Sequence, residues 1–421
     1  MYSRVATKAA ARGYASVASP AVTSTANGIR VAATGGDSGL ATVSLVINAG
    51  SRHETVETVG AAHYLKAFGF RNTQGRTSFR TIREAELNGA QLTAEATREN
   101  ITYRVQCFSD AVPYFVDVLG DIAAETRFAE HEFRDVERVV EFEALSARAD
   151  AATRALDGVH QAAFRGGLGN SLYAPHGSPV ATGNAVAQYA KSALVGGRVA
   201  VVATGVDATE LARLVGESKL SQLPGQSAPA LEAAQFVGGM QQVYESASPV
   251  AHYALAFPCA PGAAPVLAAL LGSRRAKWGV GSSPLAQAAS RLGFSAETFS
   301  FSYSDAGVVG VLVSAQATHM REAVKQVAEC VQKYVARPDA SSVQRAVAAA
   351  RVDVADLMAT HEGAARALGQ LALGQSAATL ESVEAAQGSL SATAQKVFSS
   401  KPVAVSIGLP QSTPYVDTLG F

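Results

Sequence analysis

Eight histidines could serve as metal ligands or general bases, at positions 53, 63, 131, 160, 176, 252, 319 and 361. Two histidines separated by three residues on a helix can grip a zinc ion from one face. No pair has that spacing, and the serine-hydrolase elbow, the phosphate-binding loop and the EF-hand loop are also missing from the sequence. The motifs therefore predict no catalytic, cofactor-binding or metal-binding residue.

Three cysteines, Cys107, Cys259 and Cys330, lie far apart in the chain. They form neither a Cys-x-x-Cys pair nor the Cys-x-x-Cys-His signature of haem attachment, and they are too dispersed to hold an iron–sulfur cluster. We expect reduced thiols that pack as small buried hydrophobic groups. No cofactor is predicted.

One segment comes close to a zinc motif. Gly50-Ser51-Arg52-His53-Glu54, followed by Gly60-Ala61-Ala62-His63-Tyr64-Leu65, resembles the start of the inverted-motif zinc peptidases, the pitrilysin and mitochondrial processing peptidase family. Active members of that family carry His-x-x-Glu-His, in which the glutamate is the general base, and a further glutamate ligand later in the chain. On this sequence the resemblance assigns these roles, in order, to His63, Lys66, Ala67 and Glu143.

The residues at these positions argue against hydrolysis. A hydrolytic zinc needs three protein ligands and an open position for water, but Ala67 offers no lone pair. Lys66 places a cation where a proton acceptor is required, and its charge repels a divalent ion. The resemblance therefore implies a degenerate, non-catalytic site without metal. In this interpretation His63 is a structural histidine and Lys66 pairs with Glu143.

Three further segments narrow the resemblance to the core protein 2 family of the mitochondrial cytochrome bc1 complex (complex III): Leu92–Tyr103, Tyr303–Gly310 and Thr413–Leu419. The resemblance implies a structural subunit without a redox centre, needed for assembly and stability of a complex that transfers electrons from ubiquinol to cytochrome c. The implied partners are core protein 1, cytochrome b, cytochrome c1 and the Rieske protein, in a dimeric complex. The implied location is peripheral, on the matrix side of the inner membrane.

An alternative stays open, the non-catalytic, presequence-binding α subunit of the mitochondrial processing peptidase. The resemblance implies a long, glycine-rich loop in that subunit. The corresponding segment here, Leu271–Leu285, has only three glycines. It also carries Arg274, Arg275 and Lys277, whose charges would repel a basic presequence. The sequence therefore favours the core protein.

The amino terminus has the composition of a targeting segment. No Asp or Glu occurs before Asp37, whereas Arg4, Lys8 and Arg12 recur at every fourth position and would form one basic stripe on a helix. Such a segment, rich in Ser, Ala and Arg, is typical of a mitochondrial transit peptide. We expect residues 1–14 to be this peptide and to be removed by cleavage after Tyr14.

The composition predicts a folded protein with large cores, because 48% of the 421 residues are hydrophobic and 17% are charged. Lys and Arg together number 35, as do Asp and Glu, so the formal net charge is +0, which argues against a nucleic-acid partner. The longest uncharged stretch, Ser246 to Ser273, is interrupted by prolines, which break a helix. No continuous membrane-spanning helix is predicted there.

Both halves of the chain show a similar order of elements. Strands are predicted at 29–33, 41–49, 91–96, 102–108 and 198–204, and in the second half at 242–244, 253–257, 297–302, 308–315 and 403–407. Helices are predicted at 60–67, 81–87, 111–124, 130–164 and 208–215. In the second half, a turn at 258–262 is expected to lead into a buried helix rich in Ala and Leu, and further helices are predicted at 319–336 and 341–359. Asp339 or Ser341 can cap the last of these helices.

The turn Asn27-Gly28 predicts a tight hairpin, and the Ser, Gln, Pro and Gly cluster at 219–230 predicts an exposed connector. The expected fold class is α+β. We expect two consecutive α/β sandwich domains of like fold, at 15–216 and 240–421, with mainly antiparallel sheets, flanking helices and a linker at 217–239.

Overall fold

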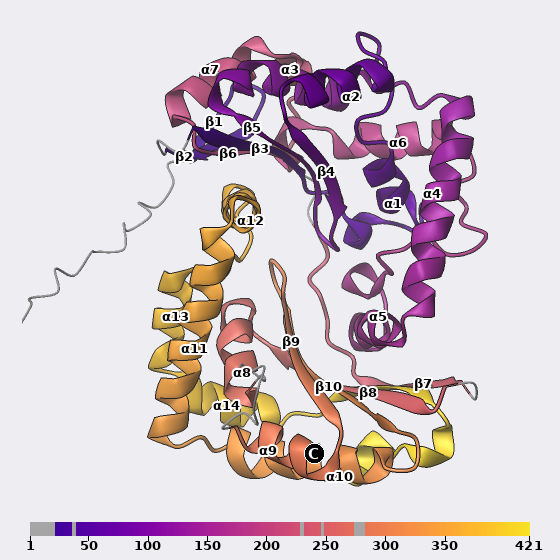
Figure 1. The fold of residues 1–421 in the computed structure, drawn as a ribbon, viewed down its shortest axis with the longest axis vertical. Coiled ribbons are helices and arrows are strands. Elements are labelled where there is room, and N and C mark those ends of the chain that lie inside the picture. The colour runs from indigo at the N-terminus through magenta and orange to yellow at the C-terminus, as the bar shows by residue number, and fades with distance from the viewer. Residues whose placement is uncertain (1–21, 36–38, 228–230, 246–247, 273–282) are drawn as a thin grey trace, which may run out of the picture.

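The computed structural model describes residues 22–35, 39–227, 231–245, 248–272 and 283–421. The expected transit peptide and most of the loop at 271–285 lie outside these residues. Each half of the chain builds one sheet with helices around it (Figure 1). Strand pairs are antiparallel except β2–β6 and β7–β11. The α+β prediction with mainly antiparallel sheets is confirmed.

The first sheet has the spatial order β1-β2-β6-β3-β5-β4. Its strands are β1 (Val22–Ser24), β2 (Arg30–Thr34), β3 (Leu40–Ile47), β4 (Gln91–Ala96), β5 (Ile101–Phe108) and β6 (Val199–Thr204). The helices of this half are α1 (Ala61–Ala67), α2 (Ser78–Leu87), α3 (Val112–Glu125), α4 (Glu130–Ala149), α5 (Ala151–Phe164), α6 (Gly183–Ala193) and α7 (Ala208–Glu217).

The second sheet has the spatial order β7-β11-β8-β10-β9. Its strands are β7 (Gly239–Tyr244), β8 (Val250–Cys259), β9 (Ser295–Ser302), β10 (Gly307–Gln316) and β11 (Val403–Gly408). The helices are α8 (Ala264–Leu271), α9 (Pro284–Leu292), α10 (Met320–Cys330), α11 (Ala340–Ala359), α12 (His361–Ala372), α13 (Leu380–Gln387) and α14 (Leu390–Phe398). A π-helical turn at Val331–Val335 extends α10, and the Asp339 side chain caps α11 by accepting the Ser342 N–H at 2.8 Å.

The two halves repeat one topology. Strands β2, β6, β3, β5 and β4 of the first sheet correspond in order and direction to β7, β11, β8, β10 and β9 of the second. The long helices correspond as well, because α4 and α11 both have 20 residues and each is followed at once by a shorter helix, α5 or α12. The duplicated order that the sequence suggested is therefore present in space.

The single long helix predicted at 130–164 is wrong, because the chain bends at Asp150. This residue has an extended backbone (ψ 111), and its carboxylate accepts hydrogen bonds from the N–H groups of Ala152 and Thr153. A side chain that satisfies the free N–H groups of a helix start stabilises a new helix there. The result is two helices, α4 and α5, that run in different directions (Figure 1).

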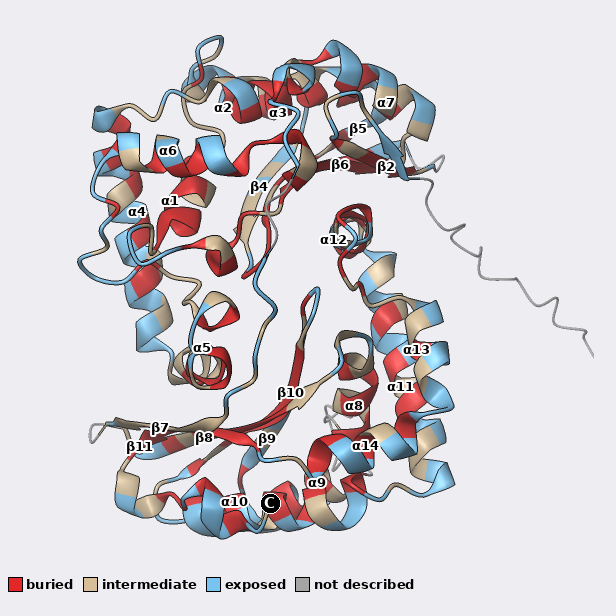
Figure 2. Ribbon diagram, turned by 180° about the vertical axis from the view of Figure 1, so that it is seen from behind, coloured by how far each residue is buried: buried red, intermediate tan, exposed pale blue. Residues whose placement is uncertain are grey.

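The bend sends α5 to the sheet of the other half. Its apolar residues Ala155, Val159 and Ala163 pack with Ala254 and Val405 of the second sheet. Figures 1 and 2 show α5 against β7 and β8, although its chain belongs to the first half. The second sheet is therefore covered on one face by a helix from the first half.

The corresponding helix of the second half, α12, makes the reciprocal crossing. Its Leu368 and Ala372 pack on Val46, Ala200 and Val202 of the first sheet. Strand β6 is buried along its whole length because α12 covers this face and other helices cover the opposite one (Figure 2). Each half thus completes the core of the other, and Thr360 caps α12 as Asp150 caps α5.

Two local predictions need correction. The Asn27-Gly28 hairpin forms, with Gly28 at a φ of 88, but Ile29 belongs to the turn because its N–H bonds to Thr25, so pairing with β1 begins at Arg30. The segment at 219–230 is not exposed throughout, since Leu220 and Leu223 are buried in the first core. These two apolar side chains, and hydrogen bonds that Asn27 and Gly196 donate to carbonyls of the segment, hold it on the protein.

A cluster of hydrogen-bonded side chains joins the two halves of the chain. It consists of Arg52, Glu99, Ser304 and Asp305 and is called the inter-half cluster below. Arg52 lies 2.8 Å from Glu99 and 2.6 Å from Asp305, and its side chain is only 3% exposed. Glu99 also accepts the Ser304 N–H at 3.0 Å and its hydroxyl at 2.6 Å. These bonds connect the β4–β5 turn to the β9–β10 turn.

Among the described residues, no helix has the length and apolarity needed to cross a membrane.

Candidate functional site

Helix α1 carries three of the four positions that the sequence singled out. It begins after Gly60, whose φ of 92 favours glycine and whose missing Cβ would lie 2.8 Å from the Cβ of Ala174. The Glu54 carboxylate accepts the N–H groups of Gly60 and Ala62 at 2.9 and 2.8 Å and fixes the start of the helix. Burial raises the pKa of Glu54 to about 7, although the hydrogen bonds from the Gly60 and Ala62 N–H groups act to lower it.

His63 is buried, and both of its ring nitrogens have partners. Nδ1 accepts the backbone N–H of Ala174 at 3.1 Å, so the ring proton lies on Nε2. Nε2 donates to Glu143 Oε2 at 2.6 Å. Burial lowers the pKa of His63, although the Glu143 carboxylate partly opposes this effect. The imidazole is therefore neutral at physiological pH and has no free lone pair.

Glu143, on α4, receives a second donor from α1. Lys66 Nζ lies 2.5 Å from the same oxygen, Oε2, that His63 contacts. Burial opposes ionisation of Glu143, but the hydrogen bonds from Lys66 and His63 outweigh it and hold its pKa below the usual value. The ammonium thus supplies the positive charge that a bound metal ion would bring to this carboxylate.

These residues do not fit a zinc ion. Ala67 has no donor atom, the His63 lone pair is already used, and Lys66 adds a positive charge beside Glu143. Within the part of the chain that the structure describes, no group of three or more His, Cys, Asp or Glu side chains could hold a metal. The arrangement can hold a proton and an ion pair.

A cavity of about 600 Å³ opens beside these side chains. His63, Lys66 and Glu143 line it together with β4, Tyr173 on the loop after α5, and Arg366 from α12. Arg366 lies 3.1 Å from Glu95 of β4, so an ion pair between the halves closes one side. Residues from both halves therefore shape the cavity.

Sequence reasoning missed three participants. Tyr173, whose ring meets that of His63 edge-on at 5.7 Å, lies in none of the motifs that the sequence offered. Ala174 acts through its backbone N–H, which no side-chain motif reveals. Arg366 lies on α12, a helix that was not predicted. The three cysteines are free. Cys107 and Cys330 are buried as expected, whereas Cys259 is only partly buried.

Comparisons with known proteins agree with this architecture. Residues 31–176 match the family model described as insulinase (peptidase family M16), and residues 181–350 match the peptidase M16 inactive domain. The cytochrome b-c1 complex subunit 2 of Cryptococcus neoformans is 35% identical over 95% of this chain and 94% of its own length. The protein of the same name from Yarrowia lipolytica is 32% identical over 94% of this chain and 96% of its own length.

A probable mitochondrial-processing peptidase subunit alpha-2 from Arabidopsis thaliana matches a smaller part of the chain. It is 32% identical over 55% of this chain and 46% of its own length. The proteins from Cryptococcus neoformans and Yarrowia lipolytica match nearly the whole chain, whereas the match to the Arabidopsis thaliana protein covers about half of its length. The chain therefore belongs to peptidase family M16, and the two relatives described above that match it over nearly its whole length are cytochrome b-c1 complex subunit 2 proteins.

Proposed function

We propose that this chain is a structural, non-catalytic core subunit 2 of mitochondrial complex III, needed for assembly and stability of the complex. The observation that carries the proposal is the match to two subunit 2 proteins over nearly the whole chain. The Lys66–Glu143 ion pair supports the non-catalytic part, because it replaces the base and the metal of a hydrolytic centre.

The proposal extends to partners and location. Core protein 1, cytochrome b, cytochrome c1 and the Rieske protein are the proposed partners, in a dimeric complex on the matrix side of the inner membrane. Residues 1–14 are proposed to direct import and to be removed. The proposed domains are 15–216 and 240–421, with the linker at 217–239, and they exchange α5 and α12 in space.

A second candidate is the presequence-binding α subunit of the mitochondrial processing peptidase. The Arabidopsis thaliana match favours it, but only over about half of either chain. Most of the loop at 271–285, where the two candidates differ in sequence, lies outside the described residues.

The deciding experiment isolates the tagged chain from mitochondria in mild detergent. The co-purifying subunits are identified by mass spectrometry, haem is measured by its redox spectrum, and zinc by elemental analysis. We expect recovery of b- and c-type haems, no stoichiometric zinc in the separated chain, and no cleavage of a presequence peptide. A matched Lys66→Gln chain tests whether the ion pair contributes to assembly.

The alternative predicts a different preparation. A haem-free heterodimer that cleaves presequences and is inhibited by a chelator would assign the chain to the processing peptidase. Zinc bound by this chain itself, with chelator-sensitive proteolysis, would overturn the non-catalytic proposal.

A further inference from the structure

The strand β7 ends the second sheet and has no neighbour on its outer side. The spatial order β7-β11-β8-β10-β9 leaves β11 as the strand that pairs with it among the described residues. Figure 1 shows β7 at the rim of this sheet. The equivalent strand of the first sheet, β2, is covered on its outer side by β1, which pairs antiparallel through Val22–Ser24. The second half, as far as the structure describes it, has no counterpart of β1.

The edge is open because the chain before β7 is used elsewhere. In the first half, the residues before β2 fold back in a hairpin and form β1. The residues before β7 come instead from the first half. The Val237 N–H donates to the Ala163 carbonyl of α5 at 2.7 Å, and the Ala234 N–H donates to Asp305 at 2.9 Å. These bonds hold the incoming segment on α5 and on the β9–β10 turn, so it cannot also pair with β7.

The outer edge of β7 presents backbone groups without partners. On the inner side, the Glu245 N–H donates to the Gly408 carbonyl of β11 at 3.0 Å. Because successive residues of a strand direct their N–H and C=O groups to opposite sides, those of Met240, Gln242 and Tyr244 point away from β11. No hydrogen bond joins these groups to another described residue. Such a row of free groups is a template for a further strand.

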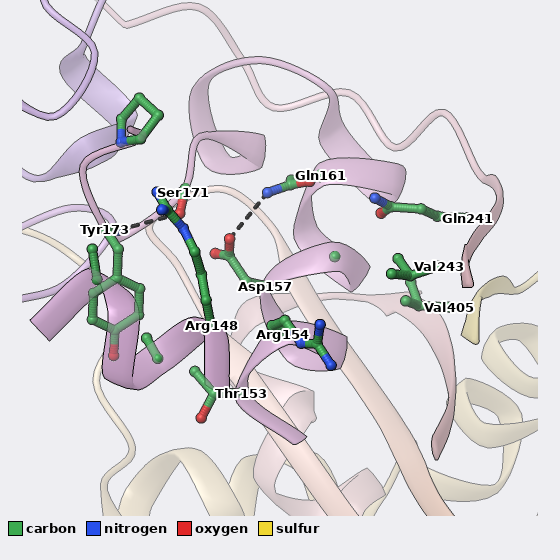
Figure 3. A pocket seen from close by; sticks show the side chains of 14 residues that line it. Arg148, Thr153, Arg154, Asp157, Gln161, Ser171, Tyr173, Gln241, Val243 and Val405 are labelled. Carbon is green, nitrogen blue, oxygen red and sulfur yellow. Dashed lines mark hydrogen bonds between the residues drawn. The ribbon is translucent and has the colours of Figure 1, made fainter. Parts of the chain in front are cut away.

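Both faces of β7 are already covered, so only its edge is free. Gln241 and Val243 lie beside Val405 of β11 on the face that α5 covers (Figure 3). Met240 packs against the second core on the opposite face. Tyr244, at the end of the strand, is 68% exposed and leaves an aromatic ring beside the edge. A strand added here would therefore gain backbone hydrogen bonds and one aromatic contact.

The sequence of β7 leaves this edge unprotected. Natural edge strands avoid unwanted pairing by short length, by prolines or by charges. The edge strand β1 has three residues, and the edge strands β4 and β9 carry Glu95 and Glu297. β7 has six residues, Gly-Met-Gln-Gln-Val-Tyr, and none of them is charged or proline. Its edge is thus fit for pairing.

The first half indicates which occupant fits. β1, on the equivalent edge, is a short, uncharged strand, Val-Thr-Ser, and it runs antiparallel to β2. A second copy of this chain fits less well, because stable interfaces bury about 1,200–2,000 Å² and a single strand edge is narrow. An extended segment of another polypeptide can pair along the edge without a matching globular surface.

We propose that β7 binds an extended, uncharged segment of another polypeptide as an added antiparallel strand. The backbone of this segment pairs with Met240, Gln242 and Tyr244, and a β-branched side chain packs on the Tyr244 ring. The second sheet then has six strands, as the first sheet has. The inference does not depend on which complex contains the chain.

Hydrogen exchange tests the proposal on the full chain, both free and in the assembly isolated in mild detergent with its co-purifying subunits. We expect the N–H groups of Gln242 and Tyr244 to exchange at least about tenfold more slowly in the assembly, because pairing protects them. The Glu245 N–H is the internal control, since it is bonded to Gly408 in both states. Equal exchange of Gln242 and Tyr244 in the two states overturns the proposal.

Photo-cross-linking from p-benzoyl-L-phenylalanine placed at position 244 identifies the occupant, and we expect an uncharged segment of another subunit. Gln242→Pro removes one outward N–H and leaves the β11 pairing intact, so the cross-link yield should fall at least about threefold. Gln242→Ala keeps the N–H and should retain the yield.

Circular dichroism checks the fold of both variants. If Gln242→Pro does not fold, the exchange comparison on the wild type decides. A cross-link to a second copy or to a charged segment, or equal yields from the folded Gln242→Pro and Gln242→Ala chains, overturns the proposal.

Discussion

At the scale of single residues, the buried histidines of this protein are structural because both of their nitrogens are used. His160 lies between the halves, fully buried, with Nδ1 donating to the Leu156 carbonyl at 2.8 Å and Nε2 accepting the Tyr303 hydroxyl at 2.7 Å. Burial lowers its pKa to about 3. His63 follows the same rule with an amide and a carboxylate.

The neutral state of His160 predicts how stability depends on pH. The pKa is about 3 in the folded protein, against an ordinary value of 6.5, so only the unfolded chain gains a proton between these values. Relative to His160→Gln, the wild type should lose about 1.4 kcal/mol of unfolding free energy per pH unit below 6.5, or about 3 kcal/mol by pH 4.

Urea unfolding of both proteins at several pH values measures this difference. The comparison at pH 8, where the histidine is neutral in both states, gives the cost of the substitution itself. A difference between the proteins that stays constant from pH 8 to pH 4 would contradict the assignment.

At the scale of elements, the two exchanged helices are held by unequal contacts. Helix α5 brings Phe164 and other apolar residues into a broad cluster with the second sheet. Helix α12 contributes Leu368 and Ala372 to the small cluster on the first sheet, and Leu373 follows directly after the helix. Its close approach depends on Gly369, where a Cβ would lie 2.8 Å from Val46 Cγ2. The α12 contact should therefore be the more sensitive of the two.

Gly369→Ala tests this sensitivity. We expect a loss of about 1–3 kcal/mol of unfolding free energy from overpacking, reduced by the better helix propensity of alanine. Hydrogen exchange should become faster in α12. The matched control is Gly216→Ala on α7, which has open space around the added Cβ and should be neutral or stabilising. Unchanged exchange in α12 would show that the helix does not need this close contact.

The sequence predicted the elements whose pattern is local. Strands β3 and β5 carry apolar runs, and α11 has its cap at Asp339, so their own residues are sufficient. The break at Asp150 was missed because α4 and α5 both keep a helical pattern. The Asp150 cap and the packing of α5 on the second sheet together fix the bend. The cavity residues His63, Lys66 and Glu143 could be placed by resemblance, but the Ala174 amide and Arg366 could not, since both depend on tertiary contacts.

At the scale of the whole molecule, the inter-half cluster fixes how the two sheets face each other. Arg52 bridges two carboxylates, Glu99 and Asp305, that belong to different halves. Removing one partner of a buried ion pair is expensive because it leaves the other charge unpaired in a dry environment.

We therefore expect Arg52→Gln to lower the unfolding free energy by about 3–5 kcal/mol and to loosen the contact between halves. Urea unfolding measures the first effect, and the radius of gyration from small-angle scattering measures the second. Arg213→Gln is the matched control, because its pairs with Glu210 and Glu217 are exposed and should contribute little to stability. Equal losses of unfolding free energy for the two substitutions would show that the inter-half cluster contributes no more to stability than an exposed ion pair.

The crossing of α12 has a consequence for the order of folding. The first sheet is complete at Thr204, whereas the helix that covers one of its faces lies at residues 361–372. A chain that enters its compartment amino terminus first exposes the face formed by Val46, Ala200 and Val202 until these later residues arrive. During that interval the bare apolar surface is a binding site for a chaperone.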